Sequence, residues 1–160
     1  MEKTNVMRVL DQKKTPYQAY CYLEEGKEAL TNGAEVAAAL GQDPAKVFKT
    51  LVTVGKSGRN YVFMIPVAEE LDLKKAAECV REKSIVMIPQ KELLPLTGYV
   101  HGGCSPIGMK KPFPTAVHRS AADYDTILFS AGRIGYQVEV APADLARLLR
   151  VQFADLIKEA

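Results

Sequence analysis

Lys49 is the residue of this sequence whose position most suggests chemistry. It lies near the start of the segment 47–54, and in a strand alternation would place it on one face with Val47 and Leu51. The opposite face is also largely apolar, so this strand is expected to be buried on both sides. A buried ammonium group costs free energy unless it is paired or serves a site. The alternative is that Lys49 extends along its stem to solvent.

A second candidate is the segment 97–111, which contains four glycines and one proline between positions 98 and 108. Backbone of this composition excludes a regular helix or a central strand. Hydroxyl, thiol, imidazole and ammonium groups lie among the glycines. Exposed amides in such a loop can bind a carbonyl oxygen or a phosphate. The alternative is a tight surface connection that ends in a solvated lysine pair.

Cys104, within this glycine-rich segment, could act as a nucleophile with His101 or His118 as its base. A catalytic thiolate needs a base within reach, and a loop cysteine is more often a small buried residue. The two histidines lack the H-x-E and H-x-x-x-H spacings, so neither a metal nor a cofactor is predicted. The residues around Ser130 lack the G-x-S-x-G pattern, which argues against a serine hydrolase.

The composition is that of an ordinary globular chain. Its 160 residues, 48% hydrophobic and 25% charged, can bury one core, and we expect a single domain spanning 1–160. The formal net charge of +2 is too small to indicate a dedicated nucleic-acid binder. No apolar run is long enough to span a bilayer, the N-terminus has no apolar leader, and Cys21, Cys79 and Cys104 form no C-x-x-C pair. We therefore expect a cytoplasmic protein without membrane contact.

Hydrophobic periodicity and turn residues predict short helices and strands in a mixed order. Helices are expected over 4–14, 32–40 (with Asn32 as its cap), 72–80 and 142–149, with helical turns at 45–47 and 90–94. Strands are expected over 17–23, 48–54, 61–67, 85–88, 116–118, 126–129 and 137–140. The strand 85–88 is expected to be buried, and 151–157 to extend the last helix after a break. This pattern predicts an α+β fold with a mixed, partly closed and barrel-like sheet surrounded by helices.

Several motifs occur in an order that resembles a known family. They are FKTL at 48–51, LDLKKAA at 71–77, TGYV at 97–100, GGCSPIGMKK at 102–111, SAGR at 130–133 and VEVAP at 138–142. Together they cover nearly the whole chain and are similar to the YbaK/EbsC family of free-standing aminoacyl-tRNA deacylases. That family is in turn similar to the editing domain inserted in bacterial prolyl-tRNA synthetases.

The resemblance implies an enzyme that removes cysteine from mischarged Cys-tRNA(Pro), with some action on Cys-tRNA(Cys). It implies that Lys49 is the functional lysine and that Tyr22, Tyr99, Ser130 and Gly132 are pocket residues. The chain departs from some relatives in having Gln137 in place of an aspartate. Many relatives have isoleucine at the position of Cys104, which further weakens the case for this thiol as the nucleophile.

The resemblance also implies a mechanism in which the thiol of the substrate cysteine attacks its own ester carbonyl. The tRNA then leaves and a cyclic thiolactone forms, so the activity could be classed with lyases rather than hydrolases. Lys49 is expected to hold the terminal adenosine, its phosphate or the amino acid. Backbone amides near Gly102 and Gly103, or from Ser130 to Gly132, are candidate donors to the developing oxyanion.

The low net charge predicts weak tRNA binding at physiological salt, so prolyl-tRNA synthetase is the expected partner that holds the tRNA. Three alternatives remain open from the sequence. The chain could prefer Ala-tRNA(Pro), as other branches of the editing superfamily do. It could be a non-catalytic module that binds tRNA or a nucleotide, or it could be a thiol enzyme that uses Cys104.

Overall fold

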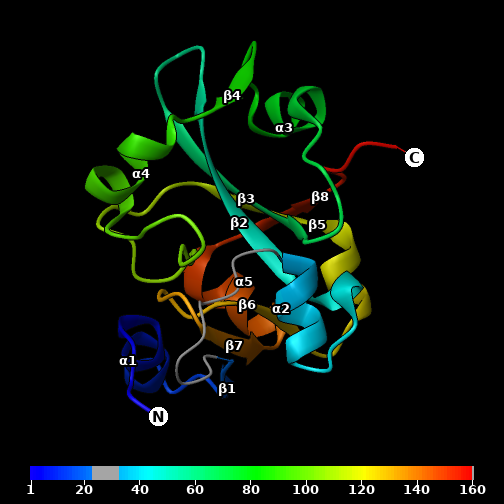
Figure 1. The fold of residues 1–160 in the computed structure, drawn as a ribbon. Helices are drawn as coiled ribbons and strands as arrows, with labels where there is room; N and C mark the ends of the chain where they lie inside the picture. The colour runs from blue at the N-terminus through cyan, green and yellow to red at the C-terminus, as the bar shows by residue number, and fades with distance from the viewer. Residues whose placement is uncertain (23–32, 160) are drawn as a thin grey trace.

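The computed structural model describes residues 1–22 and 33–159, and there the strands form two sheets (Figure 1). The mixed sheet has the order β4-β2-β3-β5-β8, with β2 (Phe48–Gly55), β3 (Asn60–Pro66), β4 (Ile85–Met87), β5 (Thr115–His118) and β8 (Gln152–Ala154). The antiparallel sheet has the order β1-β7-β6, with β1 (Gln18–Cys21), β6 (Ile127–Ser130) and β7 (Tyr136–Val140). The predicted mixed α+β fold is confirmed.

The two sheets meet along β2 and β6 without closing into a barrel in the described residues. A single parallel bridge, between Val47 and Leu128, joins them at the start of β2. Because no further bridge between described residues of these two strands follows, β2 and β6 separate beyond this point. The barrel-like closure expected from the sequence is therefore not confirmed.

The helices surround the two sheets, and α3 begins after a side-chain cap. They are α1 (Asn5–Gln12), α2 (Gly33–Ala39), α3 (Leu73–Val80), α4 (Gln90–Thr97) and α5 (Pro142–Leu149), with 3-10 turns η1 (Pro44–Lys46) and η2 (Arg119–Asp123). The Asp72 carboxylate accepts hydrogen bonds from the Lys74 and Lys75 amides, which satisfies two free donors at the start of α3. The expected cap Asn32 and the end of the strand at Leu23 lie outside the described residues.

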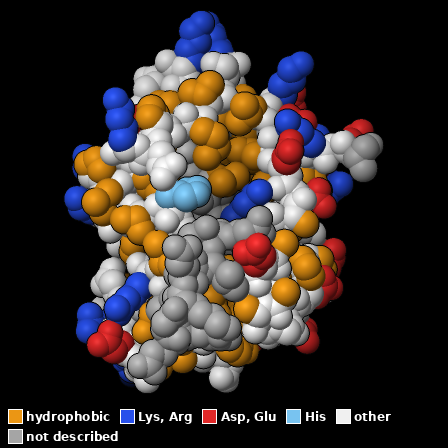
Figure 2. Space-filling view, viewed as in Figure 1, with side chains coloured by type: hydrophobic (Ala, Val, Ile, Leu, Met, Phe, Trp, Pro, Cys, Tyr) orange, Lys and Arg blue, Asp and Glu red, His pale blue; other side chains and the backbone are white. Residues whose placement is uncertain are grey.

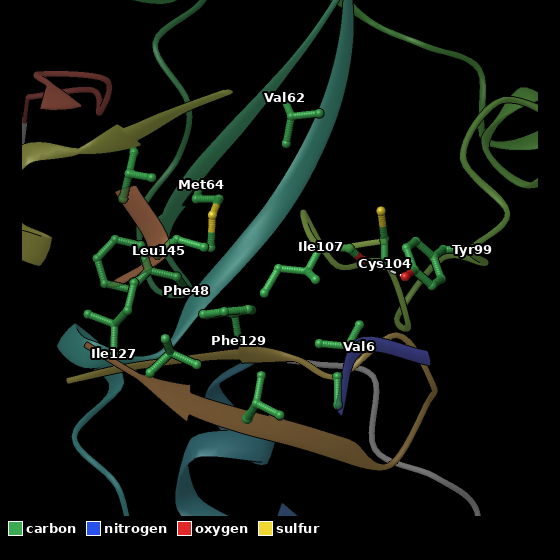
Figure 3. Close-up of a cluster of buried hydrophobic side chains, with 14 of the residues drawn as sticks. Val6, Phe48, Val62, Met64, Tyr99, Cys104, Ile107, Ile127, Phe129 and Leu145 are labelled. Atoms are coloured by element: carbon green, nitrogen blue, oxygen red, sulfur yellow. Dashed lines mark hydrogen bonds between the residues drawn. The ribbon is translucent and has the colours of Figure 1, made fainter. Parts of the chain in front are cut away.

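The larger core cluster fixes the two sheets against each other (Figure 3). It combines Phe48 and Met64 from the mixed sheet, Phe129 from β6, Val6 from α1 and Leu145 from α5, each at most 2% exposed. Burying a side chain of this size stabilises the fold by about 1.5–3 kcal/mol. Since Phe48 and Phe129 lie in this one cluster, the packing also holds the two strands β2 and β6 at a defined separation.

The hairpin of β2 and β3 confirms the prediction for 48–54 and 61–67, but two other sequence predictions are wrong. The strand β4 is an exposed edge rather than a buried strand, with Val86 54% and Met87 44% exposed.

Residues 151–157 do not extend the last helix. Arg150 ends α5 in a left-handed conformation, and the following residues form β8 parallel to β5. The brief turn predicted at 90–94 continues as α4 to Thr97.

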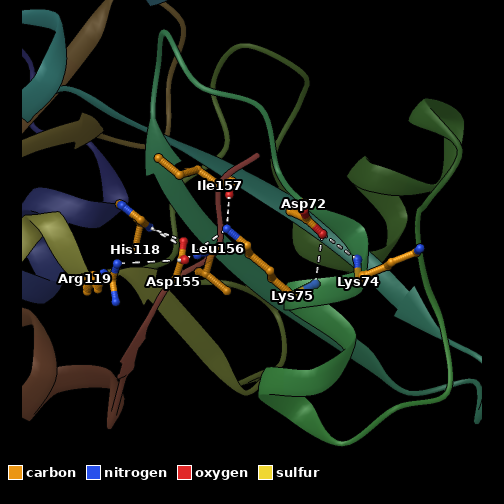
Figure 4. A network of polar contacts seen from close by, with 8 residues as sticks. All are labelled: Asp72, Lys74, Lys75, His118, Arg119, Asp155, Leu156 and Ile157. Atoms are coloured by element: carbon orange, nitrogen blue, oxygen red, sulfur yellow. Dashed lines mark hydrogen bonds and ion pairs between the residues drawn. The ribbon is translucent and has the colours of Figure 1, made fainter. Parts of the chain in front are cut away.

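A polar network holds the C-terminal segment against the mixed sheet (Figure 4). The Leu156 amide donates to His118 Nδ1 at 3.2 Å, and the Lys75 ammonium donates to Asp155 at 3.0 Å and to the Ile157 carbonyl at 2.7 Å. These contacts join residues about 40 and 80 positions apart in the chain. Hydrophobic periodicity reports only neighbours in sequence, which is why it did not predict β8.

Candidate functional site

A pocket of about 360 Å³ lies where β2 and β6 separate, at the junction of the two sheets. Figure 2 shows this face of the molecule, with hydrophobic side chains gathered in the region of β2 and β4. The described residues that line the pocket are Tyr22, Gly33, Val36, Val47, Phe48, Lys49, Thr50, Leu51, Val52, Val67, Met87, Ile88, Gln90, Leu93, His101, Gly102, Cys104, Ser130 and Gln137. The structure thus brings together Lys49, Tyr22, Gly102 and Ser130 of the residues expected from the sequence.

Lys49 lies in the wall of this pocket. The bridge between Val47 and Leu128 fixes the register of the two strands, so Lys49 and Ser130, each two residues further along, lie on the same face. Burial lowers the pKa of Lys49, and the Glu70 and Glu69 carboxylates oppose this effect. No hydrogen bond or ion pair joins its ammonium group to another described residue. Lys49 is therefore a partly desolvated cation with free donors beside the pocket.

Two hydroxyl groups near Lys49 have oxygens that already accept hydrogen bonds from the loop between β6 and β7. The Gly132 amide donates to Ser130 Oγ at 3.1 Å, and the Gly135 amide donates to the Tyr22 hydroxyl at 3.2 Å. Burial raises the pKa of Tyr22, whereas the Gly135 amide and the Gln137 side chain lower it. With their oxygens occupied in this way, both hydroxyls can turn their hydrogens toward a ligand.

Gln137 and Thr50 supply oxygens that have no partner in the described part of the chain. The Gln137 side chain is 7% exposed, and its Oε1 accepts no hydrogen bond. Thr50 Oγ1 is also buried and without a partner. A buried polar atom of this kind costs about 1–3 kcal/mol when nothing fills it. Two such atoms in one pocket indicate a site that is completed by a ligand.

The glycine-rich segment contributes His101, Gly102 and Cys104 to the pocket, while Tyr99 and Gly103 do not line it. Tyr99 is 7% exposed, and its hydroxyl donates to the Ile107 carbonyl. A side chain at position 103 would come within 2.9 Å of the Ile134 backbone nitrogen, so only glycine allows this close approach. Tyr99 and Gly103 therefore hold the segment against its neighbours.

Gly132 also lies outside the pocket lining, where a side chain would meet the Tyr99 ring at 2.8 Å. The amides of Gly103 and Gly132 are already used, since they donate to the Val100 carbonyl and to Ser130 Oγ respectively. Among the glycines expected to donate to an oxyanion, Gly102 is the one that lines the pocket.

Cys104 is a small buried residue, as the sequence favoured. Its side chain lies among the core residues, and burial raises the pKa of its thiol to about 12, an effect that the Thr97 hydroxyl opposes. A thiol with this pKa is protonated at neutral pH and is a poor nucleophile. His118 does not line the pocket, and its Nδ1 accepts the Leu156 amide. Of the two expected bases, His101 lines the pocket with Cys104 and His118 does not. The burial that keeps the thiol protonated is therefore what argues against Cys104 as the nucleophile.

The apolar part of the pocket was missed in the sequence. Leu93 and Ile88 come from the segment that carries α4 and β4, and Val36 comes from α2. Nothing in the spacing of these residues connects them to Lys49. Thr50 did carry a usable signal, because it is a hydroxyl residue between Phe48 and Val52 on a face that is otherwise apolar.

Residues 1–22 and 33–159 contain neither a cluster of potential metal ligands nor a helix that could span a membrane. No group of three or more His, Cys, Asp or Glu residues in these ranges is arranged to hold a metal ion. No helix in the same ranges has the length and apolar character needed to cross a membrane.

The fold and the pocket correspond to one class of protein. The aminoacyl-tRNA editing domain family matches residues 27–148, and this chain belongs to that family. Its resemblance to free-standing editing proteins is also confirmed. Over 155 residues it is 44% identical to the protein of Enterococcus faecalis named "Putative Cys-tRNA(Pro)/Cys-tRNA(Cys) deacylase EbsC", covering 97% of this chain and 93% of that relative.

Solved structures agree with this assignment. A protein described as a "putative trans-editing enzyme for prolyl tRNA synthetase" has a TM-score of 0.81 and 25% identity, with 99% of this chain and 100% of that chain covered. The "hypothetical protein APE2540" has a TM-score of 0.86 at 21% identity, covering 97% and 100% of the two chains, and this likeness concerns the fold alone.

Proposed function

We propose that this chain removes cysteine from mischarged Cys-tRNA(Pro), and also acts on Cys-tRNA(Cys), as a free-standing editing enzyme. One observation carries the proposal: a relative 44% identical over nearly the whole chain is named for this deacylase activity. The pocket supports it, because Lys49, Tyr22 and Ser130 direct hydrogen-bond donors toward a space that also has an apolar end.

The proposed reaction uses a nucleophile that the substrate carries. The cysteine sulfur attacks the ester carbonyl carbon, a C–S bond forms, and the C–O bond to the tRNA ribose breaks. The thiol proton is transferred to the departing ribose oxygen, so the products are uncharged tRNA and a four-membered thiolactone. The protein has to hold sulfur and carbonyl together and to stabilise the oxyanion of the intermediate.

The polar residues of the pocket fit these two tasks. Lys49 and the hydroxyls of Tyr22 and Ser130 provide donors for the carbonyl oxygen and the neighbouring ribose or phosphate. Leu93, Val52 and the protonated Cys104 line the apolar end, which we assign to the substrate side chain. A pocket of this kind distinguishes amino acids by size only modestly, so the thiol itself supplies much of the selectivity.

The test is a deacylation panel on Cys-tRNA(Pro), Ala-tRNA(Pro) and Pro-tRNA(Pro) with purified wild-type protein. We expect rapid loss of cysteine only, no loss above background with Lys49→Ala, and unchanged activity with the control Lys56→Ala at the tip of the β2–β3 hairpin. Faster loss of alanine would assign the chain to Ala-tRNA(Pro) instead. If the wild type deacylated none of these substrates faster than Lys49→Ala, the alternative of a non-catalytic binding module would remain.

A second substrate tests the mechanism. S-methylcysteinyl-tRNA(Pro) has a similar shape but no thiol proton, and its sulfur cannot form the thiolactone. We expect it to resist the enzyme while still competing with Cys-tRNA(Pro) for the pocket. Cleavage of both substrates at similar rates would show hydrolysis by water and would refute the cyclisation step.

Prolyl-tRNA synthetase is proposed as the partner that presents the tRNA. The formal net charge of +2 supports this, because few excess cations predict weak binding to tRNA phosphates at physiological salt. Adding the synthetase should lower the concentration of Cys-tRNA(Pro) needed for half-maximal rate. Tight binding of tRNA to the isolated protein at moderate salt would contradict this part of the proposal.

A further inference from the structure

Gln137 presents a buried oxygen to the pocket that nothing in the described residues satisfies. Alternation along β7 places Tyr136, Val138 and Val140 in the core and turns Gln137 to the opposite face. Ser130 on β6 and Tyr20 on β1 are its direct neighbours across the sheet. The side chain is 7% exposed, and its Oε1 accepts no hydrogen bond.

Gln137 and Tyr22 lie in the same pocket, where the Gln137 oxygen is the unpaired end of the amide. Burial raises the pKa of Tyr22, and the Gln137 side chain lowers it against this larger effect. The Gly135 amide donates to the Tyr22 hydroxyl oxygen at 3.2 Å. Because Gln137 Oε1 is buried and has no partner in the described residues, this carbonyl oxygen is available to a ligand.

The other polar groups of the pocket offer mainly donors. Lys49 has ammonium hydrogens, and Tyr22 and Ser130 have hydroxyl hydrogens that are not needed by the loop amides. No aspartate or glutamate occurs among the described residues that line the pocket. A ligand group that carries several donor hydrogens therefore has few acceptors to choose from, and the buried ones are Gln137 Oε1 and Thr50 Oγ1.

An aminoacyl ester has one group of that kind near its reacting carbonyl, the α-ammonium group. Its carbonyl and ester oxygens are acceptors that match Lys49, Tyr22 and Ser130. Its ammonium group is a donor that would repel the Lys49 cation and needs an oxygen. A neutral amide oxygen can bind it without the desolvation cost that a buried carboxylate carries.

We propose that Gln137 is the positioning residue that recognises the free α-ammonium group of the aminoacyl ester, through its side-chain oxygen. This inference rests on the proposed function and adds to it a rule for the substrate: the amino group must be free and protonated. Gln137 thereby orients the aminoacyl group so that its carbonyl faces the donors of Lys49, Tyr22 and Ser130.

The experiment compares two substrates that differ only in this group, cysteinyl-tRNA(Pro) and 3-mercaptopropionyl-tRNA(Pro). Wild type should prefer the first by about tenfold or more in kcat/KM, because a site built for a hydrogen bond rejects the analogue that lacks it. Gln137→Leu should abolish this preference by slowing the cysteinyl substrate, with the mercaptopropionyl rate changed by less than about twofold. The control Gln18→Leu, which changes an exposed residue of β1 in the same sheet, should keep the preference.

A role confined to packing would slow both substrates by the same factor in Gln137→Leu, and that result would overturn the inference. If Gln137→Leu does not fold, Gln137→Glu provides the test. This variant should increase the preference for the cysteinyl substrate and make it sensitive to salt, because a carboxylate binds an ammonium group by charge. An unchanged preference would count against Gln137.

Binding measurements separate this inference from the proposed function. The probes are 3'-deoxy-3'-(cysteinylamino)adenosine and its deamino counterpart, whose amide bonds resist cleavage. Tighter binding of the first by wild type, lost in Gln137→Leu, would support the inference even if no deacylation were found. Equal binding of both by wild type would refute it, whatever the panel of charged tRNAs shows.

Discussion

Two polar residues on the same face of β7, the buried Gln137 and the half-buried Glu139, have opposite surroundings. Glu139 accepts hydrogen bonds from the Tyr20 hydroxyl at 2.6 Å, from Lys46 at 3.2 Å and from the Thr126 hydroxyl. Gln137, two residues earlier, keeps an oxygen without a partner in the described residues. Protein groups therefore satisfy the Glu139 carboxylate, whereas no described group satisfies the Gln137 oxygen.

The same contrast separates two lysines three residues apart. Lys46 is paired with Glu139, whereas Lys49 contacts no hydrogen-bonding or ionic partner among residues 1–22 and 33–159. Buried polar groups in proteins are normally satisfied, and of the three unpartnered buried side-chain oxygens in the described residues, those of Thr50 and Gln137 lie in this one pocket, whereas Ser120 Oγ lies outside it. The comparison predicts that changes at Glu139 and Lys46 will affect stability, and that changes at Gln137 and Lys49 will affect activity.

The largest effect is expected at Lys49. Lys49→Met should reduce the single-turnover rate of Cys-tRNA(Pro) deacylation by about 100-fold or more, as the loss of an oriented donor to an oxyanion does. The free energy of unfolding should not fall, because burial already disfavours this cation and no described partner is lost. Urea denaturation followed by circular dichroism measures the second quantity, and a clear loss of stability would mean that Lys49 belongs to the scaffold.

The next effect is expected at Glu139. Burial acts to raise its pKa, but the Thr126, Tyr20 and Lys46 donors outweigh this and lower it below the usual range. Glu139→Gln should therefore reduce the free energy of unfolding by about 2–3 kcal/mol, since Lys46 loses its counter-charge inside the fold.

Activity measured per folded molecule of Glu139→Gln should stay within about threefold of wild type, because Glu139 does not line the pocket. The matched variant is Gln137→Glu, which makes the reverse exchange of amide and carboxylate at position 137. If Glu139→Gln lost most of its activity without losing stability, Glu139 could no longer be assigned to the scaffold and distinguished from Gln137.

The sequence predicted this scaffold better than it predicted the site. Lys49 was identified because one cation in an apolar strand is unusual, and the β2–β3 hairpin because its turn and alternation are local. The role of Gln137 depends on the pocket that it shares with Tyr22, a residue more than a hundred positions away in the chain. Likewise, Tyr99 and Gly132 were expected in the pocket, but neither lines it, and the space in which a side chain at position 132 would lie is taken up by the Tyr99 ring.

A smaller effect of opposite sign is expected when Gln137 is replaced. In the absence of substrate, its unfilled oxygen costs free energy, so Gln137→Leu should raise the free energy of unfolding by up to about 1 kcal/mol. Thermal unfolding with and without the non-cleavable cysteinylamino adenosine probe measures this. The wild type should be stabilised by the probe and the variant much less. A variant that is destabilised by more than about 1 kcal/mol would place Gln137 with Glu139 among the structural residues.

The smallest effect concerns pH, and it extends the comparison to the two histidines. His101 lines the pocket, whereas His118 lies in the scaffold with its Nδ1 bonded to the Leu156 amide. Burial lowers the pKa of His118. The nearby Asp155 carboxylate opposes this shift, and the Arg119 cation adds to it. The neutral form is therefore favoured in the folded protein. Its contribution to stability is fully present above the unfolded pKa of about 6.5 and is lost as the pH falls below it.

Unfolding of the wild type should accordingly need less urea at pH 5.5 than at pH 7.5. His118→Gln should weaken this pH dependence, because the amide oxygen can still accept the Leu156 amide but cannot take up a proton in this range. His101→Gln should leave it unchanged, since His101 is exposed at the pocket. If His101→Gln removed the pH dependence and His118→Gln did not, the assignment of this pH dependence to the buried His118 would be wrong.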